Sequence, residues 1–278
     1  LMSFEHAVRA LHLPKPTEDM QALGQRTHPA WQRIKFDELV AQQVSMRLHY
    51  LARRERLAPV LARDGATMRQ FLAKLPFQLT SAQQRCLEEI LIDLNAPHPM
   101  QRLLQGDVGS GKTIVAAIAA LAAVDAGAQA AVMAPTEILG EQHHRKFSEW
   151  LAPLGVRIAW LHGGLGRKEK RAVLASIAQG ETQIAIGTHA LFQEDVVFQR
   201  LALAVVDEQH RFGVQQRLAL RRKATAEGNV PHQLMMSATP IPRTLSMSYY
   251  ADLDVSVIDA LPPGRSPVRT RLVRSEEH

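Results

Sequence analysis

The chain has 278 residues and a formal net charge of +6 at pH 7, with 33 Lys and Arg against 27 Asp and Glu. Its single cysteine, Cys86, excludes a disulfide within the chain and suits a reducing compartment. No apolar run reaches the ~20 residues that a membrane span needs. The length suffices for one large domain or for one domain with an extension. No charged-then-apolar leader opens the chain, and we expect it to be a stretch of a longer protein.

The basic excess lies at the N-terminal end. Residues 1–80 hold 12 Lys and Arg against 7 Asp and Glu, whereas residues 81–278 hold 21 against 20. Such an excess indicates either a surface that meets nucleic-acid phosphates or a solvated helix face, and charge alone does not separate the two.

The first elements in chain order are helices. Residues 34–62 have the apolar spacing of one long helix. We expect its apolar stripe to pack on a neighbouring element; the stripe consists of Phe36, Leu39, Val40, Val44, Leu48 and Leu51. A short helix is predicted over 68–75, and a further helix, capped by Thr80 or Ser81, through Leu94.

From residue 100 onward, short apolar runs alternate with helical segments. Strands are predicted at 102–105, 129–134, 156–161, 183–187, 203–207, 233–237 and 254–259. Repeated strand-then-helix order predicts an α/β fold with a mainly parallel sheet that helices cover on both faces. Ligands of such sheets bind beyond the carboxyl ends of the strands.

A phosphate-loop pattern, G-x-x-x-x-G-K-[ST], occupies residues 106–113, between a predicted strand and a predicted helix at 113–126. Its small residues let the backbone curl, so that N–H groups and the helix start surround nucleotide phosphates. Lys112 is expected to contact the β- and γ-phosphates, and Thr113 to contact Mg²⁺. The cradle itself is formed by Gly106, Gly109, Ser110 and Gly111. The sequence therefore predicts a nucleotide site.

Two adjacent carboxylates, Asp207 and Glu208, end a predicted buried strand. Such a pair is costly at a strand tip unless a cation or a reaction uses it, although a solvated acidic loop is the alternative. Beside a phosphate loop, we expect Asp207 to hold Mg²⁺ through water. Glu208 would polarise the water that attacks the γ-phosphate. Lys112, Asp207 and Glu208 are thus the candidate catalytic residues.

Two weaker patterns accompany this site. Ser237 and Thr239 follow a strand, and their hydroxyls would either relay the nucleotide state or form an ordinary turn. The Gln83 amide suits the N6 and N7 edges of adenine, and Phe77 would stack near the base. From the pattern alone, a surface Gln and a core Phe are the better interpretation.

The histidines lack metal-ligand spacing. His143 and His144 are adjacent and cannot both face one ion from one helix face, and no H-E-x-x-H pattern occurs, so zinc is not expected. His162 and His189 follow predicted strands and are candidates to face a ligand.

These patterns, in this order, resemble the superfamily 2 helicases and translocases, and among them the bacterial helicases of branched DNA. The resemblance covers about residues 70–270. It is carried by residues 75–83, 106–113, 134–139, 187–191, 207–214, 237–245 and 250–265. The resemblance implies a RecA-like phosphate-loop lobe that uses ATP and Mg²⁺.

The resemblance also implies roles at matching positions. Phe77 and Gln83 would meet the adenine, which reverses the interpretation from the pattern alone. The path of the DNA backbone would follow Thr136, Gly163, Gly164, Thr188 and His189. Coupling between the ATP and DNA sites would use His210, Ser237 and Thr239.

The implied organisation has three parts. Residues 1–70 would be a helical connector behind an absent wedge domain, residues 71–260 the first helicase lobe, and residues 261–278 a linker towards an absent second lobe. We expect a monomer of the bacterial cytoplasm and nucleoid that acts on branched or duplex DNA and not on membranes. Two alternatives stay open: a translocase of transcription-coupled repair, and a nucleotide-gated interaction module without motor activity.

Overall fold

The computed structural model describes residues 2–208, 228–238 and 253–260. These residues belong to two compact units, one containing residues 2–55 and the other containing the described residues from Arg56 onward. Among them, no helix combines the length and the apolar character needed to cross a membrane.

The N-terminal unit consists of helices α1 (Phe4–His12), α2 (Met20–Gly24) and α3 (Pro29–Arg54). Its small core is formed by Ala7, Ala10 and Ala30, with Met2, Leu11 and Ile34 packed against it. The six side chains of the predicted apolar stripe on α3 remain 43–61% exposed. The described residues therefore do not provide the packing that the stripe led us to expect.

The expected helix over 34–62 was wrong at its C-terminal end, because α3 stops at Arg54. Pro59 explains the shortening, since a proline disfavours the helical conformation of the residue before it and cannot donate its own hydrogen bond. The backbone N–H groups of Ala58 and Leu61 instead donate to the carbonyls of Pro97 and Leu94, at 3.0 and 2.9 Å.

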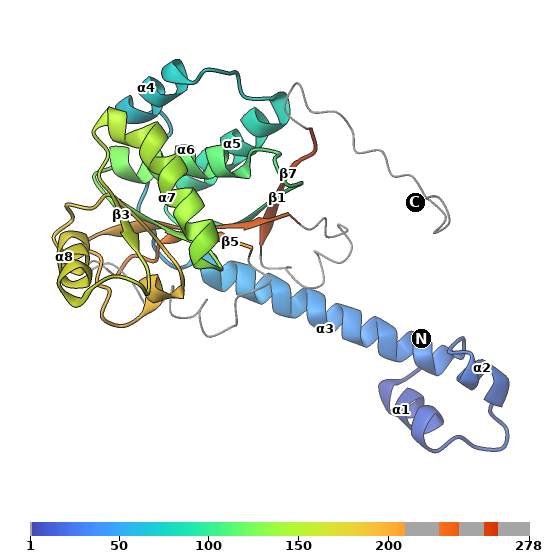
Figure 1. Ribbon diagram of the computed structural model, residues 1–278. Coiled ribbons are helices and arrows are strands. Elements are labelled where there is room, and N and C mark those ends of the chain that lie inside the picture. Colours follow the sequence, from blue (N-terminus) through green and yellow to red (C-terminus); the bar gives the residue numbers. More distant parts are fainter. Residues whose placement is uncertain (1, 209–227, 239–252, 261–278) are drawn as a thin grey trace, which may run out of the picture. The chain divides into compact units, whose positions relative to one another are not determined.

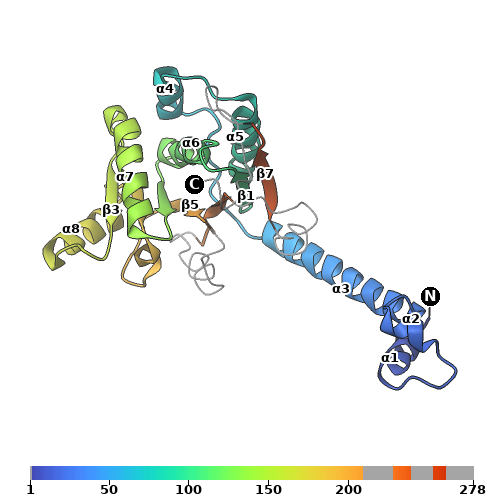
Figure 2. The same cartoon turned by 45° about the vertical axis from the view of Figure 1, so that its right-hand side comes forward.

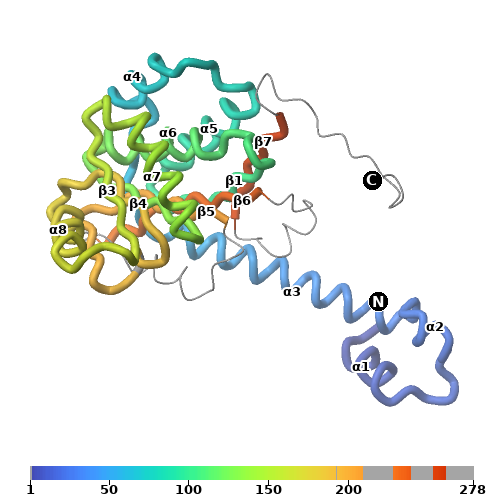
Figure 3. Tube along the Cα trace, viewed as in Figure 1, coloured from blue at the N-terminus to red at the C-terminus, as the bar shows by residue number. Residues whose placement is uncertain are grey.

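The second unit is a seven-stranded sheet whose described strand pairs are all parallel, in the order β3-β4-β2-β5-β6-β1-β7. Figure 3 traces the chain through this unit and labels both edge strands, β3 and β7. The strands are β1 (Gln101–Gly106), β2 (Gln129–Met133), β3 (Ile158–Leu161), β4 (Ile184–Gly187), β5 (Leu201–Asp207), β6 (His232–Ser237) and β7 (Asp254–Ile258). All seven predicted strands are present with ends within two residues of the prediction, and the predicted RecA-like α/β fold is confirmed.

Helices cover both faces of this sheet. The helices are α4 (Ala66–Lys74), α5 (Ser81–Leu94), α6 (Lys112–Asp125), α7 (Glu137–Leu151) and α8 (Arg167–Ala178), with 3₁₀ turns η1 (Ala152–Leu154) and η2 (His189–Phe192). The larger core lies between α4–α7 and one face of the sheet, and α4, α5 and α6 lie together on that side (Figures 1 and 2). The smaller core joins α8 and η2 to the opposite face.

One buried histidine connects separate parts of this unit. His232 is 0% exposed at the start of β6. Its Nδ1 accepts from the Met100 backbone N–H at 3.0 Å, so its Nε2 carries the proton that it donates to the Pro59 carbonyl at 2.7 Å. Burial lowers the pKa of His232 to about 4, because the charged form would lose its hydration.

Candidate nucleotide and DNA site

The phosphate loop connects β1 to α6 at the carboxyl edge of the sheet. Gly111 begins the helix with φ +91°, in the left-handed region that favours glycine, and a Cβ there would lie 2.2 Å from Gln83 Nε2. Lys112 Nζ donates to the carbonyls of Gly106 and Asp107 at 2.6 and 3.1 Å. In this structure the lysine thus lies across its own loop.

The electrostatic setting of Lys112 is mixed. Burial lowers the pKa of its ammonium. The nearby carboxylates Asp207, Glu208 and Asp107 oppose that shift. The lysine is therefore held close to the acidic groups with which it is expected to share a nucleotide.

Gln83 connects the start of α5 to the phosphate loop. Its Oε1 accepts from the Thr80 backbone N–H at 2.9 Å, completing a capping box, and its Nε2 donates to the Ser110 carbonyl at 2.7 Å. The side chain is buried, and both ends of its amide contact backbone. Bidentate contact with adenine would require this amide to exchange its partners, so adenine recognition stays a prediction.

The two carboxylates at the tip of β5 have different partners. Asp207 Oδ2 lies 2.7 Å from His143 Nε2 on α7, and both residues are buried. Glu208 has φ +51°, an uncommon conformation for a residue with a side chain, and its Oε1 accepts from the Ala238 backbone N–H at 3.2 Å. His143 is a residue that the sequence analysis considered only as a metal ligand and set aside.

A cavity of about 800 Å³ brings most of these groups together. Of the residues predicted to serve nucleotide binding and catalysis, its wall contains Phe77, Gln83, Gly109, Gly111, Lys112, Thr113, Asp207 and Glu208. His143, which contacts Asp207, also lies in this wall. The volume suits a small organic ligand such as a nucleotide.

The chemistry of these groups fits a phosphate and a hard cation. Within the described part of the chain, Ser110 Oγ is buried without a hydrogen-bond partner. The Thr113 hydroxyl and the Asp207 carboxylate offer oxygen atoms, and oxygen is the ligand that Mg²⁺ prefers.

The residues predicted to meet DNA follow β2, β4 and β3, three neighbouring strands of the sheet. Thr136 caps α7, and its Oγ1 accepts from the Leu139 N–H at 3.3 Å. The Gly163 N–H, which we expected to donate to a DNA phosphate, donates to Glu137 Oε1 at 2.9 Å in this structure. The Gly164 N–H donates to His162 Nδ1 at 3.2 Å. Glu137 lies in the motif at 134–139, but the sequence patterns gave it no role.

The remaining predicted residues differ in their exposure. Thr188 is buried at the N-terminus of η2, whereas His189, the next residue, is exposed. Ser237 is buried at the end of β6. His210 and Thr239 lie outside the described residues.

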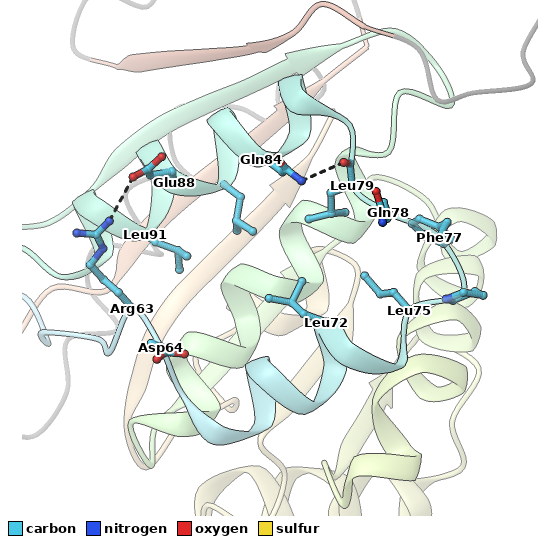
Figure 4. Close-up of a pocket in the computed structure, with 12 residues that line it drawn as sticks. Arg63, Asp64, Leu72, Leu75, Phe77, Gln78, Leu79, Gln84, Glu88 and Leu91 are labelled. Atoms are coloured by element: carbon cyan, nitrogen blue, oxygen red, sulfur yellow. Dashed lines mark hydrogen bonds and ion pairs between the residues drawn. The ribbon is translucent and has the colours of Figure 1, made fainter.

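A second cavity, of about 860 Å³, lies beside α4 and α5 (Figure 4). Leucines from both helices line it, among them Leu72, Leu87 and Leu91, and Arg63 Nη2 pairs with Glu88 Oε1 at 3.7 Å. Phe77 and Gln78 line both cavities. Asp207 and Glu208, which line the first cavity, do not line this second one.

Comparison with known proteins agrees with this geometry. A family model for DEAD/DEAH box helicases matches residues 80–248, more than half of the chain. The ATP-dependent DNA helicase RecG of Haemophilus influenzae is 52% identical over 274 residues, 99% of this chain and 40% of that protein. RecG of Escherichia coli K12 is 52% identical over 271 residues, 97% of this chain and 39% of that protein. The chain thus spans about 40% of the length of these relatives.

Solved structures give the same result. The structure of RecG bound to a three-way DNA junction superposes with a TM-score of 0.77 and 34% identity, over 96% of this chain and 39% of that one. The helicase MrfA bound to DNA and AMPPNP has a TM-score of 0.55 at 18% identity, over 74% of this chain and 30% of that one, and so supports the fold alone. The resemblance inferred from the motifs is confirmed.

Proposed function

The chain belongs to the DEAD/DEAH box helicase family, and we propose that it is the first motor lobe of an ATP-dependent DNA helicase that remodels forks and Holliday junctions in recombination and repair. One observation carries the proposal. The phosphate loop and both carboxylates share one cavity at the carboxyl edge of the sheet, and the expected DNA residues follow neighbouring strands at the same edge. The likeness to RecG supports branched DNA as the substrate.

In the proposed ATP site, each residue has a definite task. Lys112, which donates to two loop carbonyls in this structure, would contact the β- and γ-phosphates instead. Phe77 and Gln83, which line the same cavity, would meet the adenine. Thr113 would hold Mg²⁺ directly and Asp207 would hold it through water, and the ion would neutralise charge on the phosphates. Glu208 orients and polarises the attacking water.

In the proposed DNA site, the lobe contacts phosphates and not bases. Backbone N–H groups at Gly163 and Gly164, together with Thr136, Thr188 and His189, would meet the DNA backbone. Phosphate contacts carry no sequence information, which suits a motor that moves over any sequence. Ser237, with His210 and Thr239, would transmit the nucleotide state to this path.

The organisation of the whole protein is part of the proposal. Residues 1–70 serve as a connector behind a wedge domain, residues 71–260 as the first lobe, and residues 261–278 as the linker to a second lobe. That second lobe would supply an arginine to the γ-phosphate, which contributes ~10³–10⁵ in rate where such fingers occur. We propose a monomer that works in the bacterial cytoplasm, at the nucleoid.

ATP hydrolysis by the intact protein, with and without branched DNA, tests this function. Strong stimulation by a three-way junction, abolished by Lys112→Ala, is the expected result. A nucleotide-gated interaction module would bind ATP without such stimulation. Stimulation that depends on RNA polymerase instead of on junctions would favour a translocase of transcription-coupled repair.

A further inference from the structure

We propose that His143 is a positioning residue that holds the Asp207 carboxylate in the orientation needed for magnesium. This inference rests on the proposed ATP site, since it concerns how that site is kept ready. His143 lies on α7 and Asp207 at the tip of β5, so residues 64 positions apart in the sequence meet in the fold.

The contact is short and enclosed. His143 Nε2 and Asp207 Oδ2 are 2.7 Å apart, and the two residues are only 7% and 9% exposed. An ionised carboxylate only accepts hydrogen bonds, so Nε2 carries the proton and donates it to Oδ2. That hydrogen bond occupies one carboxylate oxygen and leaves Oδ1 for the cavity that Lys112 and Thr113 also line.

The imidazole is itself held in place. The Phe147 ring, one helical turn further along α7, meets it edge-on with ring centroids 6.5 Å apart and an interplanar angle of 82°. Phe147 is fully buried in the main core. The imidazole that donates to the carboxylate is therefore itself packed against a residue of the main core.

The expected size of the effect follows from the chemistry of metal sites. The groups around a metal site are held in place by hydrogen bonds to outer partners, and loss of such a partner typically reduces metal affinity by ~10–100-fold. A carboxylate free to rotate loses orientation but keeps its charge. The main consequence should therefore appear in the dependence on magnesium, and not in the affinity for nucleotide without metal.

The chain provides its own control residue. His144 is adjacent to His143, but its ring stacks on Trp160 with centroids 6.2 Å apart. A substitution at His144 therefore disturbs the same helix without touching Asp207.

Two polar substitutions separate the hydrogen bond from the space that the ring fills. The side-chain amide of Gln can reach the position of Nε2, whereas the shorter Asn amide matches Nδ1 and cannot reach Asp207. We would compare His143→Gln, His143→Asn and His144→Asn in the intact protein. Calorimetry would measure AMPPNP affinity in EDTA and across a magnesium titration.

His143→Asn should raise the magnesium concentration for half-maximal tightening of AMPPNP binding by about 10–100-fold, with affinity in EDTA unchanged. In His143→Gln and His144→Asn, that magnesium concentration should stay within about threefold of its value in the parent protein. An unchanged magnesium requirement in His143→Asn would overturn the inference. The inference would also fail if His143→Gln raised the magnesium requirement as much as His143→Asn. It would fail as well if His143→Asn weakened AMPPNP binding in EDTA by the same factor. If the parent protein bound no AMPPNP at all, the proposed function itself would fail, which is a distinct result.

Discussion

The Glu208 carboxylate accepts a hydrogen bond of 3.2 Å from the backbone N–H of Ala238. This contact joins the tip of β5 to the tip of the neighbouring strand β6, next to the buried Ser237. The group proposed to polarise the attacking water is thus tied to the segment proposed to relay the nucleotide state. A change at one of these tips has a direct physical route to the other.

Ala238→Pro should uncouple ATP hydrolysis from DNA, because proline removes the N–H that contacts Glu208. We expect nucleotide affinity to be retained while stimulation of hydrolysis by junction DNA falls by about tenfold or more, the scale of 1.4 kcal/mol in a barrier. Ala238→Gly keeps the N–H and is the control. Full stimulation in the proline variant would rule out this route.

Lys112→Ala and Glu208→Gln should separate binding from chemistry. Loss of the ammonium removes a contact with the ground-state phosphates, so nucleotide affinity should fall. Glu208→Gln keeps the shape of the side chain but removes the carboxylate, so nucleotide should still bind while turnover drops by ~10²–10⁴. Binding and single-turnover assays measure the two effects, and equal loss of binding in both variants would contradict the role of Glu208.

The free energy of unfolding should depend on pH through the protonation of His232. Its pKa is about 4 in the folded chain, below the ordinary value of 6.5, so the folded state binds fewer protons than the unfolded state between these values. The neutral, buried His232 therefore contributes about 3 kcal/mol to the free energy of unfolding above pH 6.5, and this contribution is lost as the pH falls towards 4. Urea unfolding across this range measures it. His232→Gln should remove that part of the slope, and an unchanged slope would mean that other groups cause it.

Glu137→Gln should tighten DNA binding. The carboxylate accepts from the Gly163 N–H at 2.9 Å, so its negative charge lies where a DNA phosphate is expected. The glutamine keeps an acceptor but removes that charge, and we expect a gain of a few-fold at low salt that shrinks as salt screens the repulsion. Titration of labelled fork DNA at two salt concentrations checks this. Weaker binding by the variant would mean that Glu137 mainly orders the glycine loop.

Much of the fold could be predicted because buried parallel strands have a strong local signature. Each strand of the sheet reads as a short apolar run, and the next described element after each of β1, β2, β3 and β4 is a helix or a 3₁₀ turn. The end of α3 was missed because apolar spacing continues past Arg54, whereas Pro59 and hydrogen bonds to Leu94 and Pro97 determine the chain path there. Those carbonyls belong to a distant segment that no local pattern identifies.

The site was predictable to the extent that local motifs carry it. The phosphate loop and the paired carboxylates are contiguous in the sequence, and the structure brings them into one cavity. His143 and Glu137 were missed because their partners, Asp207 and Gly163, come from other strands. Glu137 stood inside a motif, at 134–139, and His143 in a pair of adjacent histidines, but neither pattern indicates the partner that the fold brings to it.

The most direct test of the central claim is ATP-dependent remodelling of a labelled fork by the intact protein. If the lobe is part of a motor for branched DNA, the fork should be converted into a four-way junction and separated strands in the presence of ATP and Mg²⁺. The Glu208→Gln variant should bind the fork and leave it unchanged. Fork conversion by that variant at the parent rate, or no conversion by a parent protein that hydrolyses ATP, would contradict the account.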